Sequence, residues 1–189
     1  QTFQIAENLQ ITNKLIKIVR NLQNIGLGGA IKKGLDKANL YKVMFLPGDN
    51  CHQSSEINKL INTNGNYDLV LTYYSNPEVR TFLRNYFTKL YTPFLNFIFG
   101  LNLPYYNGLG VYKRSILKDM NIYTNSFTWQ IEVLLKLFKT KNLLYVCIPT
   151  VLNDRAEGKS KAFSLKNSIY VILSITRLFI VRFFLKKRN

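Results

Sequence analysis

Short apolar runs alternate with segments of helical spacing along most of the chain. The runs that read as strands are residues 17–20, 41–46, 67–73, 108–113 and 143–151. The helices predicted between them are residues 27–38, 54–62, 77–99 and 128–138. Strands and helices that alternate in this way favour an α/β sandwich around a parallel sheet, whose ligands bind beyond the carboxyl ends of the strands.

The predicted helix 77–99 is long and amphipathic, and Pro93 is a point at which it can bend. Its apolar side chains recur at steps of three and four residues, a spacing typical of side chains packed in a core. They are Val79, Phe82, Leu83, Tyr86, Phe87, Leu90, Phe94 and Phe97. Arg80, Arg84 and Thr88 follow one another at four-residue steps and therefore share another face of the helix.

The C-terminal segment 163–189 carries a second apolar stripe at helical spacing. A spanning helix needs roughly 20 mainly apolar residues. Arg177 and Arg182 fall inside the only window available, where a central charge costs about 2.5 to 3.5 kcal/mol. A helix lying in the membrane interface is therefore favoured, and packing on the domain's own core is the alternative. The stripe comprises Ile169, Ile172, Leu173, Thr176, Phe179, Ile180, Phe183 and Phe184.

Composition narrows the class of protein. The chain has 189 residues and is 47% hydrophobic, enough for one compact domain and too little for two. Its formal charge of +16 predicts an anionic partner such as phosphate, nucleic acid or acidic lipid. Cys51 and Cys147 lack metal-ligand spacing, which fits a reducing compartment. Since the sequence does not begin with Met and has no signal-like start, we expect further residues before Gln1.

Two motifs carry candidate phosphate chemistry. The first is N-x-G-x-G-x-A-I-x-x-G, formed by Asn24, Gly26, Gly28, Ala30, Ile31 and Gly34. Its small residues let the backbone approach a ligand, and the following helix offers amide hydrogens to an anion. About 20 residues on, Asp49 ends an apolar strand, where a carboxylate can hold a divalent cation against a diphosphate. The alternatives are ordinary turn glycines and an aspartate that caps the helix near Ser54.

The order and spacing of these motifs resemble the family 2 glycosyltransferases, in which an asparagine-glycine helix opening precedes a strand that ends in a metal-binding aspartate motif. The resemblance covers nearly the whole chain and is closest to the polyprenyl-phosphate branch, the relatives of dolichol-phosphate mannosyltransferase. Arg84 and Thr88 match the pair that binds the acceptor phosphate in this branch. Residues 107–114 match a glycine that leads into a strand followed by basic residues, and residues 155–161 match an R-x-x-G-x-S-K loop.

This resemblance implies a GT-A type α/β sandwich over residues 1–162, followed by the membrane-associating helix 163–189. The first strand and the carboxylate that recognises the base would then precede Gln1. The implied catalytic residues are Asp49, Arg84 and Arg155. Acceptor phosphate would bind to Arg84 and Thr88. The implied nucleotide-sugar ligands are Asn24, Gly26, Gly28, Ala30, Asp49, Arg155, Ser160 and Lys161.

The metal motif departs from the common form of the family. That form has two aspartates separated by one residue, but the first position is Pro47 here, so Asp49 remains, with Asn50 and His52 as helpers. A divalent cation, Mg²⁺ or Mn²⁺, is still implied at Asp49. A flexible anion clamp over the diphosphate would be formed by Arg155, Gly158, Ser160 and Lys161.

The implied reaction is an inverting displacement in which an oxygen of polyprenyl phosphate attacks the anomeric carbon of the nucleotide sugar, at the cytoplasmic face of a membrane. A phosphate acceptor is ionised near neutral pH, whereas a sugar hydroxyl needs a general base. Glu132 is the candidate for such a base, or else a helix-face carboxylate that balances Lys136. Transfer to a sugar hydroxyl in cell-envelope polysaccharide synthesis therefore stays open. So does a non-catalytic basic module, although without a recognised nucleic-acid motif no nucleic-acid partner is expected.

Overall fold

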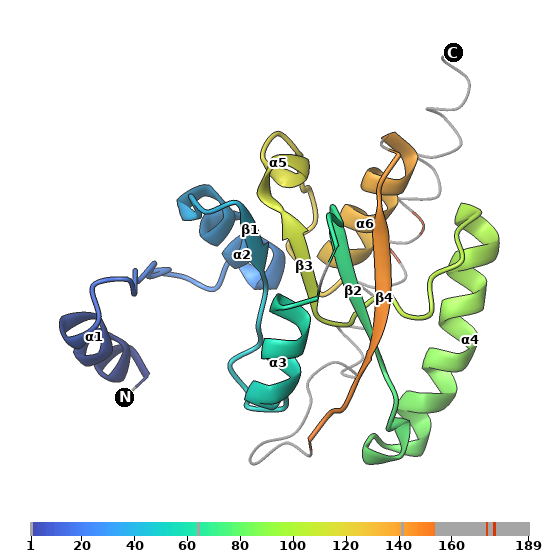
Figure 1. Ribbon diagram of the computed structural model, residues 1–189, viewed down its shortest axis with the longest axis horizontal. Coiled ribbons are helices and arrows are strands. Elements are labelled where there is room, and N and C mark those ends of the chain that lie inside the picture. The colour runs from blue at the N-terminus through green and yellow to red at the C-terminus, as the bar shows by residue number, and fades with distance from the viewer. Residues whose placement is uncertain (1, 64, 141, 154–172, 174–175, 177–189) are drawn as a thin grey trace.

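The computed structural model describes residues 2–63, 65–140, 142–153, 173 and 176. Its centre is a four-stranded sheet in the order β1-β3-β2-β4 (Figure 1). The strands are β1 (Lys42–Met44), β2 (Leu69–Tyr74), β3 (Gly110–Lys113) and β4 (Tyr145–Thr150). Four of the five predicted strands are thereby confirmed. β2 and β4 run in parallel, and β3 is antiparallel to both β1 and β2.

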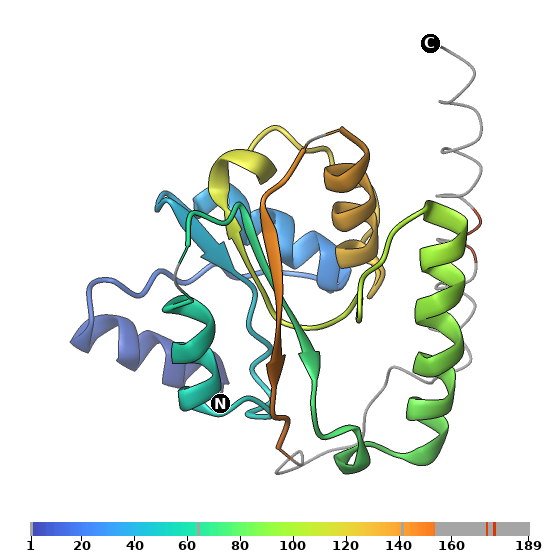
Figure 2. The same cartoon turned by 45° about the vertical axis from the view of Figure 1, so that its right-hand side comes forward.

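Helices surround the sheet (Figures 1 and 2). They are α1 (Thr2–Thr12), α2 (Gly26–Lys37), α3 (Ser54–Ile61), the 3₁₀ turn η1 (Pro77–Val79), α4 (Phe82–Phe99), α5 (Arg114–Leu117) and α6 (Trp129–Thr140). α2, α3 and α6 confirm three predicted helices, whereas α1 and α5 were not predicted. The helix expected over 77–99 is divided, because the backbone is extended at Arg80 and Thr81, and α4 then continues through Pro93.

Two predictions about the sheet are wrong. Residues 17–20 form no strand: they have no regular structure, since none of the described strands pairs with them and a lone extended segment leaves its backbone groups unpaired. The sheet is mixed rather than parallel. After α4 the chain returns to the carboxyl end of β2, where the Thr72 amide donates to the Leu109 carbonyl, so β3 runs in the opposite direction.

Alternate residues of the central strands point into two cores, which gives the predicted sandwich of helices on both faces. Leu69 and Leu71 of β2 lie in the larger core, together with buried side chains of α2, α4 and α6. Val70 lies between them in sequence and packs on the opposite face, against Leu60 of α3. The three layers hold the ends of the strands in fixed positions relative to one another.

Most aromatic side chains of α4 do not face the core as predicted. Leu95 and Phe99, which were not part of the predicted stripe, are buried, whereas the stripe members on α4 whose burial the structure describes are exposed, among them Phe82 and Phe97. The helix instead turns its Arg84 and Thr88 face inward. In the part of the chain that the structure describes, no helix is long and apolar enough to cross a bilayer. Segment 163–189 lies outside the described residues, except for Leu173 and Thr176, which are helical and exposed.

Glu132 of α6 fixes the loop that precedes its own helix. It is 3% exposed, and its two carboxylate oxygens accept hydrogen bonds from the backbone amides of Tyr123 and Thr124, each at 2.9 Å. Lys136 also donates to Glu132. The carboxylate is therefore used entirely within the fold, which supports its structural interpretation over the role of general base.

We predict that Glu132→Gln lowers the free energy of unfolding by about 2 kcal/mol, because hydrogen bonds to a charged group are replaced by weaker ones and one amide is left facing an NH₂ group. Urea unfolding followed by circular dichroism measures the change. Glu7→Gln on the exposed face of α1 is the matched control and should stay within about 0.5 kcal/mol of the wild type. Equal stability of both variants would contradict the role given to Glu132.

Candidate functional site

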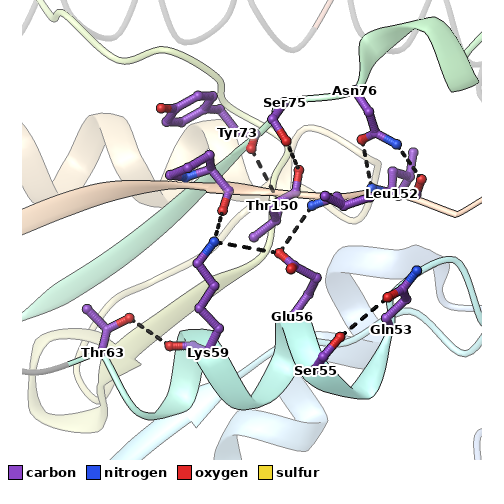
Figure 3. A network of polar contacts seen from close by, with 12 residues as sticks. Gln53, Ser55, Glu56, Lys59, Thr63, Tyr73, Ser75, Asn76, Thr150 and Leu152 are labelled. Atoms are coloured by element: carbon purple, nitrogen blue, oxygen red, sulfur yellow. Dashed lines mark hydrogen bonds and ion pairs between the residues drawn. The ribbon is translucent and has the colours of Figure 1, made fainter.

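The carboxyl ends of β1, β2 and β4 meet at one edge of the sheet, because β1 and β2 both run opposite to β3 and β4 runs with β2. Hydrogen bonds join the loops that follow them. The Asn76 side chain donates to the Leu152 carbonyl at 2.7 Å and accepts from its amide at 2.8 Å (Figure 3). The Asn153 amide donates to the Cys51 carbonyl at 2.9 Å. The predicted position of Asp49 at such a strand end is confirmed.

Helix α3 holds the end of β4 from the other side (Figure 3). The Lys59 ammonium donates to the Pro149 carbonyl at 2.8 Å, and the Val151 amide donates to the Glu56 carboxylate at 3.1 Å. Gln53 reaches Asn153 at 2.6 Å. The chain is therefore anchored up to Asn153, two residues before the predicted R-x-x-G-x-S-K region, whose residues Arg155, Ser160 and Lys161 lie outside the described part.

Asp49 and His52 supply a carboxylate and an imidazole at this edge. Asp49 is half-buried, and Asn50 after it adopts a left-handed backbone with φ of 55°, which turns the loop back toward the sheet. The His52 ring is buried and stacks on Tyr74 with 6.2 Å between ring centroids. Burial lowers the pKa of His52, and the nearby Asp49 charge opposes this, so the ring is neutral at neutral pH. Its Nδ1 has no hydrogen-bond partner among the described residues.

Arg80 is a buried cation at the same edge. Its guanidinium lies beside a pair of tyrosine rings, 5.5 Å from the centroid of Tyr74 and 5.5 Å from that of Tyr105, and it donates to the Tyr105 hydroxyl at 3.2 Å. Its Nε is buried without a partner, and no ion pair within the described ranges includes it. Since a buried charge without a counter-ion is costly, this arrangement is suited to an anionic ligand.

Sequence reasoning placed Arg80 on a face with Arg84 and Thr88 but gave it no role. The four-residue spacing of the three was the available signal. Arg84 lies at the edge as well, because its charge and that of Arg80 both oppose the rise that burial causes in the pKa of Tyr74. The Thr88 hydroxyl donates to the Arg84 carbonyl at 2.8 Å.

The glycine motif has a clear packing role. The Asn24 side chain accepts from the Gly26 amide at 2.9 Å and starts α2. A Cβ on Gly28 would lie 2.2 Å from the Thr124 carbonyl oxygen, and the Gly28 amide already donates to Asn125 at 3.1 Å. The loop before α6 therefore occupies the space beside these glycines, where a ligand was predicted to approach the backbone. Ala30 is exposed, and ligand binding by Asn24, Gly26, Gly28 and Ala30 stays a prediction.

Two groups fit a divalent cation, although no group of three or more His, Cys, Asp or Glu side chains gathers around one point within the described ranges. They are the Asp49 carboxylate and the His52 ring, which is neutral and has a buried nitrogen that none of the described residues bonds. Oxygen and imidazole ligands are both accepted by Mn²⁺, and Mg²⁺ is commonly held by one or two protein ligands plus phosphate oxygens. The donor set therefore fits a cation that a bound diphosphate completes.

Comparison with known proteins identifies a matching sequence family and a set of similar structures. The sequence profile of Glycosyl transferase family 2 matches residues 1–120. No curated protein sequence matches the chain significantly. Among solved structures, glucosyl-3-phosphoglycerate synthase from Mycobacterium tuberculosis with Mn²⁺, uridine diphosphate and glucosyl-3-phosphoglycerate is 19% identical, with a TM-score of 0.55 over 75% of this chain and 50% of that one.

The same synthase with uridine diphosphate alone is 19% identical, with a TM-score of 0.54 over 79% of this chain and 50% of that one. A further mycobacterial protein is 20% identical, with a TM-score of 0.54 over 77% of this chain and 48% of that one. The chain thus spans about half the length of these structures. At this identity they show the fold, a GT-A-like mixed α/β arrangement.

The profile match covers more than half of the chain and includes the Asp49 loop, β2, η1 and α4, so the predicted family is confirmed. The family is one of glycosyltransferase enzymes that use nucleotide sugars. The mixed sheet, the strand-end aspartate and the cations of the next loop are consistent with it, and the chain belongs to glycosyl transferase family 2.

Proposed function

We propose that the protein transfers a sugar from a nucleotide diphosphate sugar to polyprenyl phosphate, with inversion, at the cytoplasmic face of a membrane. The observation that carries this proposal is the buried Arg80, whose Nε has no partner among the described residues, at the edge that also holds Asp49 and Arg84. A carboxylate and two guanidinium groups at one strand edge suit a metal-bound diphosphate on one side and a phosphate acceptor on the other.

The donor would bind on the Asp49 side. Asp49 and His52 would hold Mg²⁺ or Mn²⁺, which neutralises charge on the departing nucleotide diphosphate. Arg155, Ser160 and Lys161 are proposed to close on that diphosphate, because Asn153 anchors their segment to the Cys51 loop. Uridine diphosphate is the first nucleotide to test, since the similar synthase binds it together with Mn²⁺ or Mg²⁺.

The acceptor phosphate would bind on the α4 side. Arg80 and Arg84 would orient its oxygens, and Thr88 lies one turn further along the same helix face. Such an acceptor carries its own nucleophilic charge and needs no strong base. Transfer to a sugar hydroxyl fits less well, because Glu132, the candidate base, is committed to Tyr123, Thr124 and Lys136.

A small phosphorylated acid is the second candidate acceptor. The similar synthase has been solved with phosphoglyceric acid and with the glucosylated product, and such an acid presents the same phosphate chemistry to Arg80 and Arg84. We favour the lipid acceptor because the sequence places a long apolar, basic segment at 163–189. A non-catalytic basic module is disfavoured by the family match, and no nucleic-acid partner is proposed.

The acceptor is tested with the full-length protein, Mn²⁺ and radiolabelled uridine diphosphate sugars, offered either polyprenyl phosphate in detergent or 3-phosphoglycerate. We expect label in the lipid product only. Asp49→Ala should abolish the transfer, because the cation loses its carboxylate, while Asp119→Ala on the exposed turn after α5 should retain it. Label only in 3-phosphoglycerate would replace the lipid proposal by the second candidate, and full activity of Asp49→Ala would overturn the metal role.

Arg80→Lys should raise the KM for polyprenyl phosphate about tenfold, because lysine keeps the charge but lacks the Nε donor, and a hydrogen bond to a charged group is worth about 1.5 to 3 kcal/mol. The affinity for uridine diphosphate, measured by calorimetry, should change less than about twofold. The control is Lys118→Gln, an exposed cation after α5 at the opposite end of the sheet. A loss of both affinities together with a lower Tm would instead assign Arg80 to structure.

Arg84→Lys and Arg155→Lys should act on opposite substrates. The Arg84 variant should raise the KM for the acceptor and the Arg155 variant the KM for the donor, since each loses the paired donors of a guanidinium. Initial rates over a grid of both substrate concentrations separate the two effects. Wild-type rates in both variants would show that neither arginine contacts a phosphate.

A further inference from the structure

The outward face of α4 is a continuous apolar stripe. Phe82 is 84% exposed and Phe97 is 89% exposed, and Tyr86, Leu90 and Phe94 between them are each exposed by more than half. These five positions follow one another at helical steps and share one side of the helix. We call this set the α4 outer face.

The inward side of α4 carries the polar side chains. Thr92 is buried, and Asn96 exchanges hydrogen bonds with the Leu103 backbone and accepts from the Tyr106 hydroxyl at 2.8 Å. Arg84 and Thr88 lie on the same side. A helix on a water-exposed surface has the opposite distribution, with its apolar stripe toward the core. An exposed aromatic stripe of this kind marks a surface for a partner.

Charge indicates which partner. The chain carries a net charge of +16, which disfavours a second copy, and from 77 to 100 it has three cations, Arg80, Arg84 and Lys89, against one acid, Glu78. Lys89 is exposed on α4 itself. A bilayer with anionic head groups combines negative charge with an apolar interior, and aromatic side chains are favoured at its interface.

The other candidate for covering the α4 outer face is segment 163–189 of the same chain. Leu173 belongs to the apolar stripe predicted for that segment, and it is itself 59% exposed. A described member of the stripe is therefore turned outward rather than covering an apolar surface. Leu173, the one apolar residue of that stripe that the structure describes, is therefore not buried against the α4 outer face, and charge favours the bilayer as the partner of that face.

We propose that the α4 outer face docks on an anionic membrane surface, with Phe82 and Phe97 entering the acyl boundary at the two ends of the helix. This binding leaves the inward Arg84 and Thr88 facing the sheet edge at the level of the head groups. The inference names the surface for the proposed membrane association, and it rests on exposure and charge, so it does not require polyprenyl phosphate as the acceptor.

Fluorescence of a Phe97→Trp variant tests the docking directly. The native Trp129 is 6% exposed and gives a constant background. With vesicles of phosphatidylglycerol the added emission should shift to the blue and be quenched by brominated lipid, and with phosphatidylcholine it should respond much less. Leu22→Trp is the matched control, because Leu22 is 92% exposed and belongs to the segment between α1 and α2. That segment lies across the molecule from α4 (Figures 1 and 2).

Emission from the Phe97→Trp variant that is already blue without vesicles, and does not change with them, would show that the chain itself or a second copy covers the face, and would overturn the proposal. A second measurement does not depend on the introduced tryptophan. Phe82→Ser combined with Phe97→Ser should reduce vesicle flotation several-fold, whereas Leu15→Ser combined with Leu22→Ser should not; equal flotation would again overturn it. The Phe82→Ser and Phe97→Ser double variant is also assayed for transfer to polyprenyl phosphate in detergent. Retained transfer would show that a loss of flotation is independent of the proposed activity.

Discussion

The hydrogen bonds that join three loops at one edge of the sheet are the interaction on which the rest of the site depends. Asn76 pairs with both backbone groups of Leu152, and Asn153 bonds to Cys51, so the ends of β1, β2 and β4 move as one unit. Backbone groups at a buried strand end must find partners, and here they find them in the neighbouring loops. This gives Asp49 and Arg80 a common frame although they lie 31 residues apart in sequence.

A buried guanidinium with no counter-ion in the described part of the chain is tolerated in this frame because aromatic rings replace water around it. The faces of Tyr74 and Tyr105 offer favourable electrostatics to Arg80, and the Tyr105 hydroxyl accepts one of its hydrogens. These contacts do not equal a counter-ion, so the group retains an unused affinity for anions. The stability of the free protein and its affinity for phosphate are therefore opposed at this residue.

The sequence predicted what depends on local periodicity and chain order. It predicted the four strands, which are apolar runs, and the helices α2, α3 and α6. It also predicted that Asp49 follows the end of a strand. The direction of β3 was not predicted, because it depends on the path of the chain after α4. The burial of Arg80 and the outward turn of Phe82 and Phe97 were equally hidden, since amphipathic spacing shows that a helix has two faces but not which one meets the core.

The bond from Asn153 to Cys51 also sets a distance for the residues that follow. Arg155 is two residues along the chain, and two residues reach at most about 7 Å. A cation on so short a tether stays within reach of the Asp49 loop at an effective concentration on the order of millimolar, whatever conformation the rest of its segment adopts. If Arg155 binds the diphosphate as proposed, its contact with a donor already held at the Asp49 loop is an intramolecular step, whose rate is set by loop motion rather than by diffusion.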